Sequence, residues 1–507
     1  MRNHVLILLA SCCACPALSQ ELPAGARLPL QHWSVPFLEH LARTGAIVDP
    51  TPLMRPWRVA DIATALERAD TTRLGRADRG TRRQILNALQ ARSSERGIIG
   101  GGDVGVVVST HQRRPEFSLR HTGSDRVSPE VSGLFGFWFG PALLILQVRY
   151  DEDLEDDPDW AGVLGQAEVG TDWGYGAYRS KYLDIELGNL SRNWGPPGFP
   201  GLLVSDWPLS YDHLFVELGP SRLHLNMLVT QLDDVPDRNG ELSRRFFLAH
   251  RLEARVTSWL DLALWQGTIL SGPNRNLEIW YLNPFQPTYF ARNKQGQQGG
   301  VNFMFGGEGQ MRVGRVHLTG GAFFDDFDVQ LGEPPALGFT GTATTPIGGT
   351  SLWLGYTLVS NLAYRTNDPA EKALVALDPD RGRFGTGLAR NFADYDQVSA
   401  KLTLVPLPGV IMAPEVTFLR QGEGDQRLPY PSRAEFDTTR TIFVGVVERT
   451  LRAALVSTIR LPLGITASLD VAMHRVANLQ HQIGASETSF VGTGVLRWGF
   501  WSGGSLD

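Results

Sequence analysis

The chain has 507 residues, of which 42% are hydrophobic and 20% are charged, and its formal net charge is −6. This length is ample for a large fold, and the weakly acidic balance argues against a nucleic-acid partner. After the N-terminal region, no apolar run approaches the roughly 18 residues of a membrane-spanning helix, so a membrane location would require a closed β-barrel.

The first residues predict a secretory signal peptide covering 1–19. A basic residue and a short apolar run open the chain, and Ala17-Leu18-Ser19 supplies the small residues that signal peptidase prefers. The three cysteines, Cys12, Cys13 and Cys15, lie upstream of that cut. We therefore expect a mature chain without disulfides, metal or cofactor. A lipobox-like stretch before Cys12 leaves lipidation of that cysteine as an alternative.

Residues 20–98 follow a helical period and are predicted to form a periplasmic helical region. Gly45 is expected to cap the first helix, Pro56 to open the second, and Thr81 with Gln84 to form a capping box for the third. The positions expected to face inward are Phe37, Leu38, Leu41, Ala42, Val59, Ile62, Ala63, Leu66, Ile85, Leu86, Ala88 and Leu89. The outer faces are rich in arginine, which predicts a solvated surface or contact with acidic barrel rims or anionic lipid headgroups.

The stretch 245–270 shows the clearest strand pattern. From Phe246 to Val256 every second residue is mostly aliphatic, and the intervening positions carry arginines and a carboxylate. The alternation resumes after a turn at Thr257-Ser258. Each arm runs for about 10–12 residues, close to the roughly 9–11 of a tilted membrane strand. An aliphatic face outside and a charged face inside are typical of a transmembrane barrel wall.

Similar segments predict an all-β transmembrane antiparallel barrel of about 18 strands spanning residues 99–507. The expected strands include 134–139, 143–150, 181–191, 222–231, 301–313, 315–325, 351–359, 397–404, 410–419, 441–449, 451–461, 465–475 and 489–498. Such a chain is expected in the outer membrane of a Gram-negative-type bacterium. Its partners there would be lipid, lipopolysaccharide and the barrel-assembly machinery. The densely acidic segment 151–160 is expected to be a solvated outer loop or, alternatively, a weak calcium site.

Three turn-rich segments stand apart from the predicted wall, at 188–210, 278–293 and 320–327, and each places aromatic residues beside Asn, Arg or Asp. Their motifs are Gly188-Asn189-Leu190, Arg192-Asn193-Trp194-Gly195-Pro196, Leu282-Asn283-Pro284-Phe285 and Phe324-Asp325-Asp326-Phe327. With the signal peptide, the helical region and the long barrel, these motifs give the chain a resemblance to the Wzi-type capsule-assembly proteins of Gram-negative outer membranes.

The resemblance implies a lectin-like activity that holds capsular or exopolysaccharide at the cell surface. Sugar C–H faces stack on Trp and Tyr, hydroxyls bind planar polar side chains, and arginine pairs with uronic-acid carboxylates. The candidate glycan-binding residues are Arg192, Asn193, Trp194, Trp207, Trp280, Tyr281, Asn283, Tyr289, Arg292, Asn293, Asp325 and Asp326. The structural alternatives for them are aromatic girdles, ordinary turns and lumen ion pairs.

Three other interpretations remain open. A porin or sugar-uptake channel would show the same alternation, and the helical region would decide whether its lumen is plugged. An outer-membrane hydrolase would need a triad assembled across strands, since the chain carries no GxSxG, HExxH or GxxxxGK motif. A soluble β-propeller would bury the aliphatic faces between shorter strands.

Overall fold

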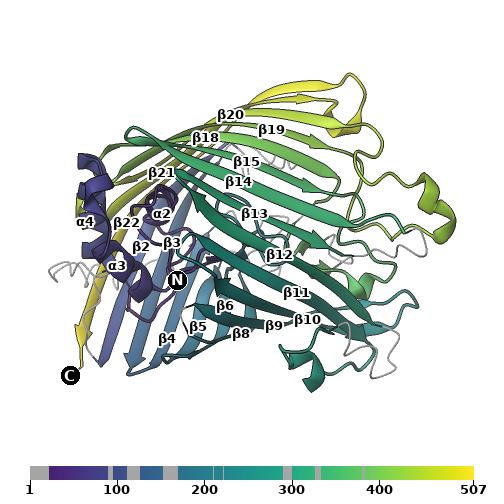
Figure 1. Ribbon diagram of the computed structural model, residues 1–507, viewed down its shortest axis with the longest axis horizontal. Helices are drawn as coiled ribbons and strands as arrows, with labels where there is room; N and C mark the ends of the chain where they lie inside the picture. The colour runs from purple at the N-terminus through teal and green to yellow at the C-terminus, as the bar shows by residue number, and fades with distance from the viewer. Residues whose placement is uncertain are drawn as a thin grey trace, which may run out of the picture.

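The computed structural model describes residues 22–89, 95–110, 126–151, 169–208, 210–220, 222–288, 300–325, 333–378, 383–390 and 392–506. Within these residues, 18 strands form one closed antiparallel barrel (Figure 1). Its strands are β2 (Arg96–Ser109), β3 (Arg126–Phe139), β4 (Ala142–Asp151), β5 (Val169–Arg179), β6 (Leu183–Leu190), β8 (Tyr211–Leu218), β9 (Leu223–Pro236), β10 (Leu242–Arg255), β11 (Leu260–Gly272), β12 (Val301–Val313), β13 (Val316–Phe324), β14 (Leu337–Ile347), β15 (Thr350–Val359), β18 (Tyr395–Leu407), β19 (Val410–Gln421), β20 (Glu448–Arg460), β21 (Ile465–Ala477) and β22 (Ser486–Ser505). This architecture confirms the predicted barrel and excludes the propeller.

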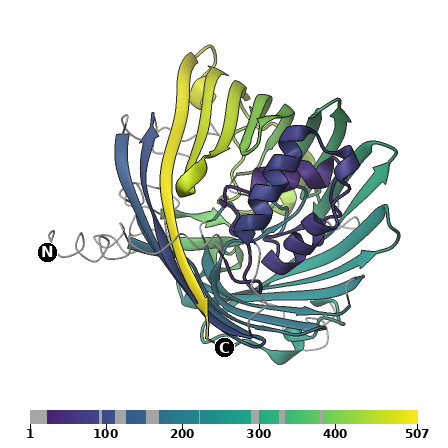
Figure 2. The same cartoon turned by 90° about the vertical axis from the view of Figure 1, so that its left-hand side faces the viewer.

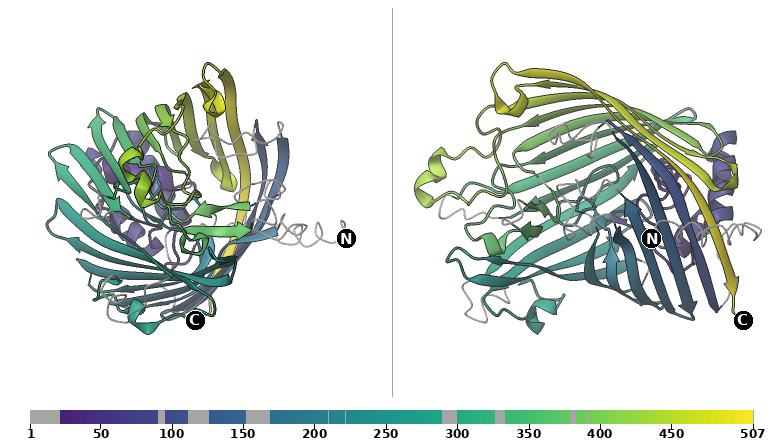
Figure 3. Two further views of the ribbon diagram at one scale, coloured as in Figure 1. Left: turned by 90° about the vertical axis from the view of Figure 1, so that its right-hand side faces the viewer. Right: turned by 180° about the vertical axis from the view of Figure 1, so that it is seen from behind.

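The barrel closes between its first and last strands, with Gly97 opposite Ser505 and Ser109 opposite Thr493. At one end, consecutive strands are joined by short turns such as those at Gly140 and Gly314, where a positive φ favours glycine. Longer connections gather at the opposite end (Figure 3). Short turns at one end and long loops at the other are typical of outer-membrane barrels.

The β10–β11 hairpin confirms the two-sided pattern of its sequence. Leu252 lies opposite Leu264, and the two side chains are 45% and 68% exposed on the outer surface. Their neighbours on the other face are Arg251 and Trp265, which also oppose each other and are buried in the lumen. Alternate residues therefore separate an apolar outer wall from a polar interior, as the pleat of a strand requires.

Three helices lie across the short-turn end of the barrel (Figure 2): α2 (Val35–Arg43), α3 (Val59–Glu67) and α4 (Arg76–Leu89). Each presents its apolar side to one continuous core. Gly45 follows α2 with a φ of +76°, as the predicted cap requires. None of the helices in the described part of the chain is both long and apolar enough to cross a membrane.

Two helix starts were predicted wrongly. Helix α4 begins at Arg76, so Thr81 is internal; its hydroxyl donates to the Ala77 carbonyl and accepts from the Gly409 backbone N–H at 2.9 Å. Asp78, whose carboxylate lies 3.2 Å from the Gly75 N–H, takes the capping role instead. Helix α3 begins at Val59 rather than at Pro56.

The strand prediction erred in both directions. The segment 441–449 is irregular up to residue 447, and β20 begins at Glu448. Strands β5, β8 and β14 did not appear as separate sequence signals, and they are real members of the wall. Glycine and threonine occupy many of their outward positions, so hydrophobic alternation is weak there.

The segment 191–208 fills much of the lumen. It forms β7 (Asn193–Trp194), which pairs with β1 (Met54–Arg55) from the N-terminal region, and then packs on inward-facing residues of the wall. The buried side chains of this inner core include Trp194, Leu202, Leu203, Phe215, Phe247, Trp265, Phe323, Tyr364 and Tyr395.

The long-loop end is tied down by two charged residues. The Arg245 guanidinium donates to the carbonyls of Ala370, Lys372 and Leu374, the last at 3.1 Å, and so holds the start of a small hairpin of β16 (Leu374–Asp378) and β17 (Arg383–Gly387). The Asp394 carboxylate accepts from the backbone N–H groups of Gly424, Phe443 and Val444 at 2.5–3.0 Å. These contacts give the loops a fixed arrangement over the lumen.

The remaining short elements are 3-10 turns in the connections. They are η1 (Thr71–Arg73), η3 (Ile279–Leu282), η4 (Pro369–Glu371), η6 (Arg433–Thr438), η7 (Pro462–Gly464) and η8 (Leu479–His481).

Candidate functional site

A polar cavity of about 340 Å³ lies inside the lumen, between the segment 191–208 and the wall formed by β15 and β18–β21. This volume is at the lower end of the roughly 300–1,000 Å³ of ligand pockets. The lining residues are Asn193, Gly198, Phe199, Pro200, Asp206, Trp207, Trp353, Gln397, Ser399, Lys401, Glu415, Thr417, Arg452, Val456 and Asp470. We take this cavity as the candidate site.

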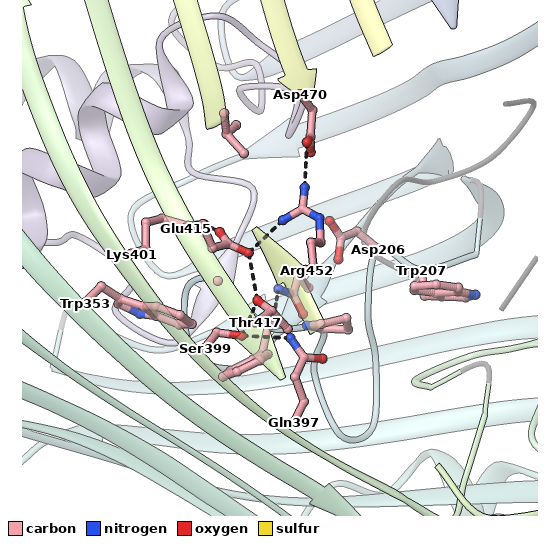
Figure 4. Close-up of a pocket in the computed structure, with 15 residues that line it drawn as sticks. Asp206, Trp207, Trp353, Gln397, Ser399, Lys401, Glu415, Thr417, Arg452 and Asp470 are labelled. Carbon is pink, nitrogen blue, oxygen red and sulfur yellow. Dashed lines mark hydrogen bonds and ion pairs between the residues drawn. The ribbon is translucent and has the colours of Figure 1, made fainter. Parts of the chain in front are cut away.

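Four charged side chains on neighbouring strands form one network along the wall of the cavity (Figure 4), which we call the cavity cluster: Lys401, Glu415, Arg452 and Asp470. Glu415 lies at its centre, 2.7 Å from the Lys401 ammonium and 3.0 Å from the Arg452 guanidinium. Arg452 also reaches Asp470 at 2.5 Å. Each cation of the cluster is therefore neutralised by a carboxylate.

Neutral polar side chains continue the network toward the long-loop end. The Thr417 hydroxyl donates to Glu415 at 3.1 Å, and the Ser399 and Thr417 hydroxyls lie 2.8 Å apart. The Gln397 amide donates to Ser399 at 3.0 Å. Amides and hydroxyls in such a row can exchange hydrogen bonds with the hydroxyls of a bound sugar.

Aromatic rings form two other parts of the lining. The Trp353 ring packs on Phe199 with centroids 5.3 Å apart, and its Nε1–H makes no hydrogen bond within the described residues. Trp207 lies edge-on to Phe392 at 6.1 Å. Both tryptophans are almost completely buried by protein, so each ring offers only an edge to the cavity.

Two of the residues predicted from the sequence line this cavity. Asn193 is held by the segment itself: its amide donates to the Phe199 carbonyl at 3.1 Å and accepts from the Gly201 N–H at 2.6 Å. Trp207 is the second. Trp194 follows Asn193 but points into the inner apolar core, where it is 1% exposed.

Arg192 belongs to a different group, which we call the plug cluster: Arg27, Arg58, Arg179, Asp184, Glu186, Arg192 and Glu217. In it, the Arg192 guanidinium donates to Glu186 and, at 2.7 Å, to His213, and it lies 3.8 Å above the Phe215 ring. Arg27 donates to Glu186 at 2.7 Å from the N-terminal region. Arg192 is 1% exposed, so these contacts, rather than a ligand, account for its burial.

Trp280, Tyr281 and Asn283 lie away from the lumen. Their turn η3 packs on the outer surface of the barrel, where Tyr281 is fully buried against Leu248 and Leu270. The Asn283 side chain accepts from the Phe285 backbone N–H at 3.1 Å, which closes a local turn. The structure therefore does not bring these residues together with Asn193 and Trp207.

Asp325 is also occupied. Its carboxylate accepts from the backbone N–H of Tyr364 at 2.6 Å, inside the protein. Tyr289, Arg292, Asn293 and Asp326 lie outside the described residues, as does 152–160 of the acidic segment. Their proposed roles stay predictions.

The sequence reasoning missed most of the cavity lining. Trp353 and the cavity cluster lie on strands that were predicted correctly, at the inward positions of each alternation. A count of inward polar residues would have found Gln397, Ser399 and Lys401 as one row on β18. It could not have placed that row beside Arg452, because this depends on the register of β18, β19 and β20.

Comparisons with known proteins add a fold-level match. No family model and no curated protein matches the chain. Among solved structures, the chain is similar to Wzi of Escherichia coli, described as an outer-membrane protein involved in group 1 capsule assembly and a carbohydrate-binding β-barrel. That match has a TM-score of 0.61 and 12% identity, and it covers 93% of this chain and 97% of Wzi.

Two Pseudomonas aeruginosa proteins are weaker matches. OccK3 (OpdO) gives a TM-score of 0.43 at 12% identity, covering 80% of this chain and 96% of OccK3. OccK9 (OpdG) gives 0.44 at 14%, covering 80% and 98%. Such scores support no argument about function. The predicted resemblance is confirmed for the fold: the chain has the closed 18-strand barrel with a few short helices to which Wzi is structurally similar.

Proposed function

We propose that this chain is an outer-membrane barrel that binds capsular or exopolysaccharide and holds it at the cell surface, without catalysing a reaction on it. The observation that carries the proposal is the lumen cavity, which combines buried tryptophan edges with amide, hydroxyl and carboxylate groups. These are the groups that bind sugar rings and their hydroxyls. The description of Wzi as carbohydrate-binding supports the same role.

The outer wall supports the membrane location. Large aliphatic side chains are exposed at outward positions all around the barrel, including Leu144, Leu146, Leu223, Leu252, Leu262, Leu264, Leu354 and Leu451. In water such a surface would drive association, whereas in a bilayer it contacts lipid tails. Lipid and lipopolysaccharide are the expected neighbours of this wall, and the barrel-assembly machinery is the expected route of insertion.

The arrangement along the chain follows from this location. We propose that residues 1–19 act as the export signal, that 20–98 form a periplasmic helical region, and that 99–507 form the membrane barrel. The helices and the short turns share one end of the barrel, and short turns face the periplasm in barrels of this kind. The long-loop end would then face outward, toward the polysaccharide.

The test is retention of surface polysaccharide, prepared from the producing strain, on the full-length protein in detergent micelles. Trp353→Ala and Trp207→Ala remove aromatic walls of the cavity, and we expect each to weaken retention by about tenfold, the effect of about 1.4 kcal/mol. Trp259→Ala is the matched control, because that ring is 51% exposed in the turn after β10. Failure of the parent protein to retain any polysaccharide would refute the proposal.

A conducting channel is the alternative. In the described residues, the segment 191–208 packs inside the lumen and three helices cover one end, which favours a plugged barrel. Single-channel recording in planar bilayers distinguishes the two functions. We expect no open state of porin size, and a stable open pore would favour the channel.

A further inference from the structure

We infer that the lumen cavity selects uncharged glycosyl units over uronic-acid units. The inference rests on the proposed function and names the substrate class of the same site. Its first support is the charge of the lining: two cationic side chains, Lys401 and Arg452, face three carboxylates, Asp206, Glu415 and Asp470, a formal balance of −1. A second carboxylate-bearing ring would enter a site that is already negative.

The second support is that both cations are engaged. Glu415 holds Lys401 at 2.7 Å and Arg452 at 3.0 Å, and Asp470 holds the other arm of Arg452 at 2.5 Å. A uronate could pair with either cation only by displacing one of these carboxylates. Arg452 is 3% exposed and Glu415 is 12% exposed, so the displaced group would remain charged, buried and unpaired, which is costly.

The third support concerns the arginines that the sequence offered for uronate binding. Arg192 is fully engaged in the plug cluster, where Glu186 and His213 occupy its guanidinium. The cavity lining in the described residues contains Arg452 as its sole guanidinium. The bidentate fork that recognises a carboxylate is therefore already bound to protein carboxylates.

Neutral sugars meet none of these costs. Their hydroxyls can donate to the free lone pairs of Glu415 and Asp470 in charge-assisted hydrogen bonds, and they can exchange bonds with Gln397 and Ser399. The Trp353 Nε1–H adds a buried donor that has no partner in the described chain. An uncharged ring thus satisfies existing groups and breaks no ion pair.

The experiment separates the surface polysaccharide of the producing strain into neutral and acidic fractions by anion exchange and offers both to the full-length protein. We expect retention of the neutral fraction to exceed that of the acidic fraction by about tenfold. It should also persist when salt rises from about 0.01 M to about 1 M, where screening shortens from about 30 Å to about 3 Å. Preferential retention of the acidic fraction would overturn the inference and leave the proposed function standing, whereas retention of neither would refute the proposed function.

A charge variant provides a second readout. Glu415→Gln releases Lys401 and Arg452 from their shared partner, so acidic-fraction retention should rise about tenfold and should fall again at high salt. Glu130→Gln is the matched control, because Glu130 also binds a lumen arginine, Arg497 at 2.9 Å, and does not line the cavity. An equal gain in the control would show a general charge effect of the barrel and would overturn the assignment to this cavity.

Discussion

The plug cluster and the cavity cluster are built from the same residue types, yet one closes the molecule and the other leaves a cavity. In the plug cluster, Glu186 is 2% exposed and accepts from Arg27, Arg179 and Arg192, with Arg27 coming from the N-terminal region. In the cavity cluster, Glu415 receives its partners from the neighbouring strands β18 and β20, and its remaining surface faces open space.

The difference lies in what each cluster connects. Burial disfavours the charged form of Arg27, but the carboxylates of Glu186, Glu217 and Asp184 outweigh it and raise the pKa of Arg27 above its ordinary value. The plug cluster therefore clamps the helical region to the wall. The cavity cluster connects wall to wall, so a ligand can replace solvent beside it without separating two parts of the chain.

The largest expected effect comes from breaking the plug cluster. Glu186→Gln removes the carboxylate that three arginines share, leaving buried cations without a full partner. We expect a loss of about 3–5 kcal/mol in the free energy of unfolding, measured by urea titration in detergent micelles. A loss below about 1 kcal/mol would mean that the arginines find other partners and that this clamp is not essential.

The same change in the cavity cluster should cost less. For Glu415→Gln we expect about 1–3 kcal/mol in the same titration, because the cavity admits water to the released cations and Asp470 still holds Arg452. A cost equal to that of Glu186→Gln would contradict the distinction between the two clusters.

The sequence predicted the wall well because strand alternation is local. Leu252 and Arg251 fall on their expected faces without knowledge of any other strand. The cavity cluster could not be predicted, since Glu415 meets Lys401 and Arg452 only through the register of three strands. The direction of a long loop is equally non-local, so nothing near Tyr281 indicated that η3 would fold onto the outer surface.

Acid should loosen the helical region with a moderate effect. His40 on α2 lies 3.1 Å from the Ser351 hydroxyl, and burial lowers its pKa below the ordinary 6.5 even though Asp78 favours the charged form. The folded state thus keeps His40 neutral, and the unfolded state takes up the proton first as pH falls. The stabilisation is complete above pH 6.5 and is lost below it, by at most about 1.4 kcal/mol per pH unit.

Hydrogen exchange of residues 22–89 checks this pH dependence. Protection should fall as pH drops below 6.5, and His40→Gln should flatten the slope because glutamine does not titrate. Comparing the two proteins at each pH cancels the intrinsic change in exchange rate. An unchanged slope in the variant would assign the acid effect to other groups.

The smallest effect is expected at the edge of the plug cluster. Arg58 reaches Asp184 at 3.2 Å and Asp61 at 2.8 Å, but its side chain is 28% exposed, so water can replace both contacts. Arg58→Ala should therefore cost about 0–1 kcal/mol in the urea titration. Asp184 would keep Arg179 at 3.1 Å as a partner. A cost close to that of Glu186→Gln would show that the clamp extends to the solvent edge, and burial would then no longer distinguish essential ion pairs from dispensable ones.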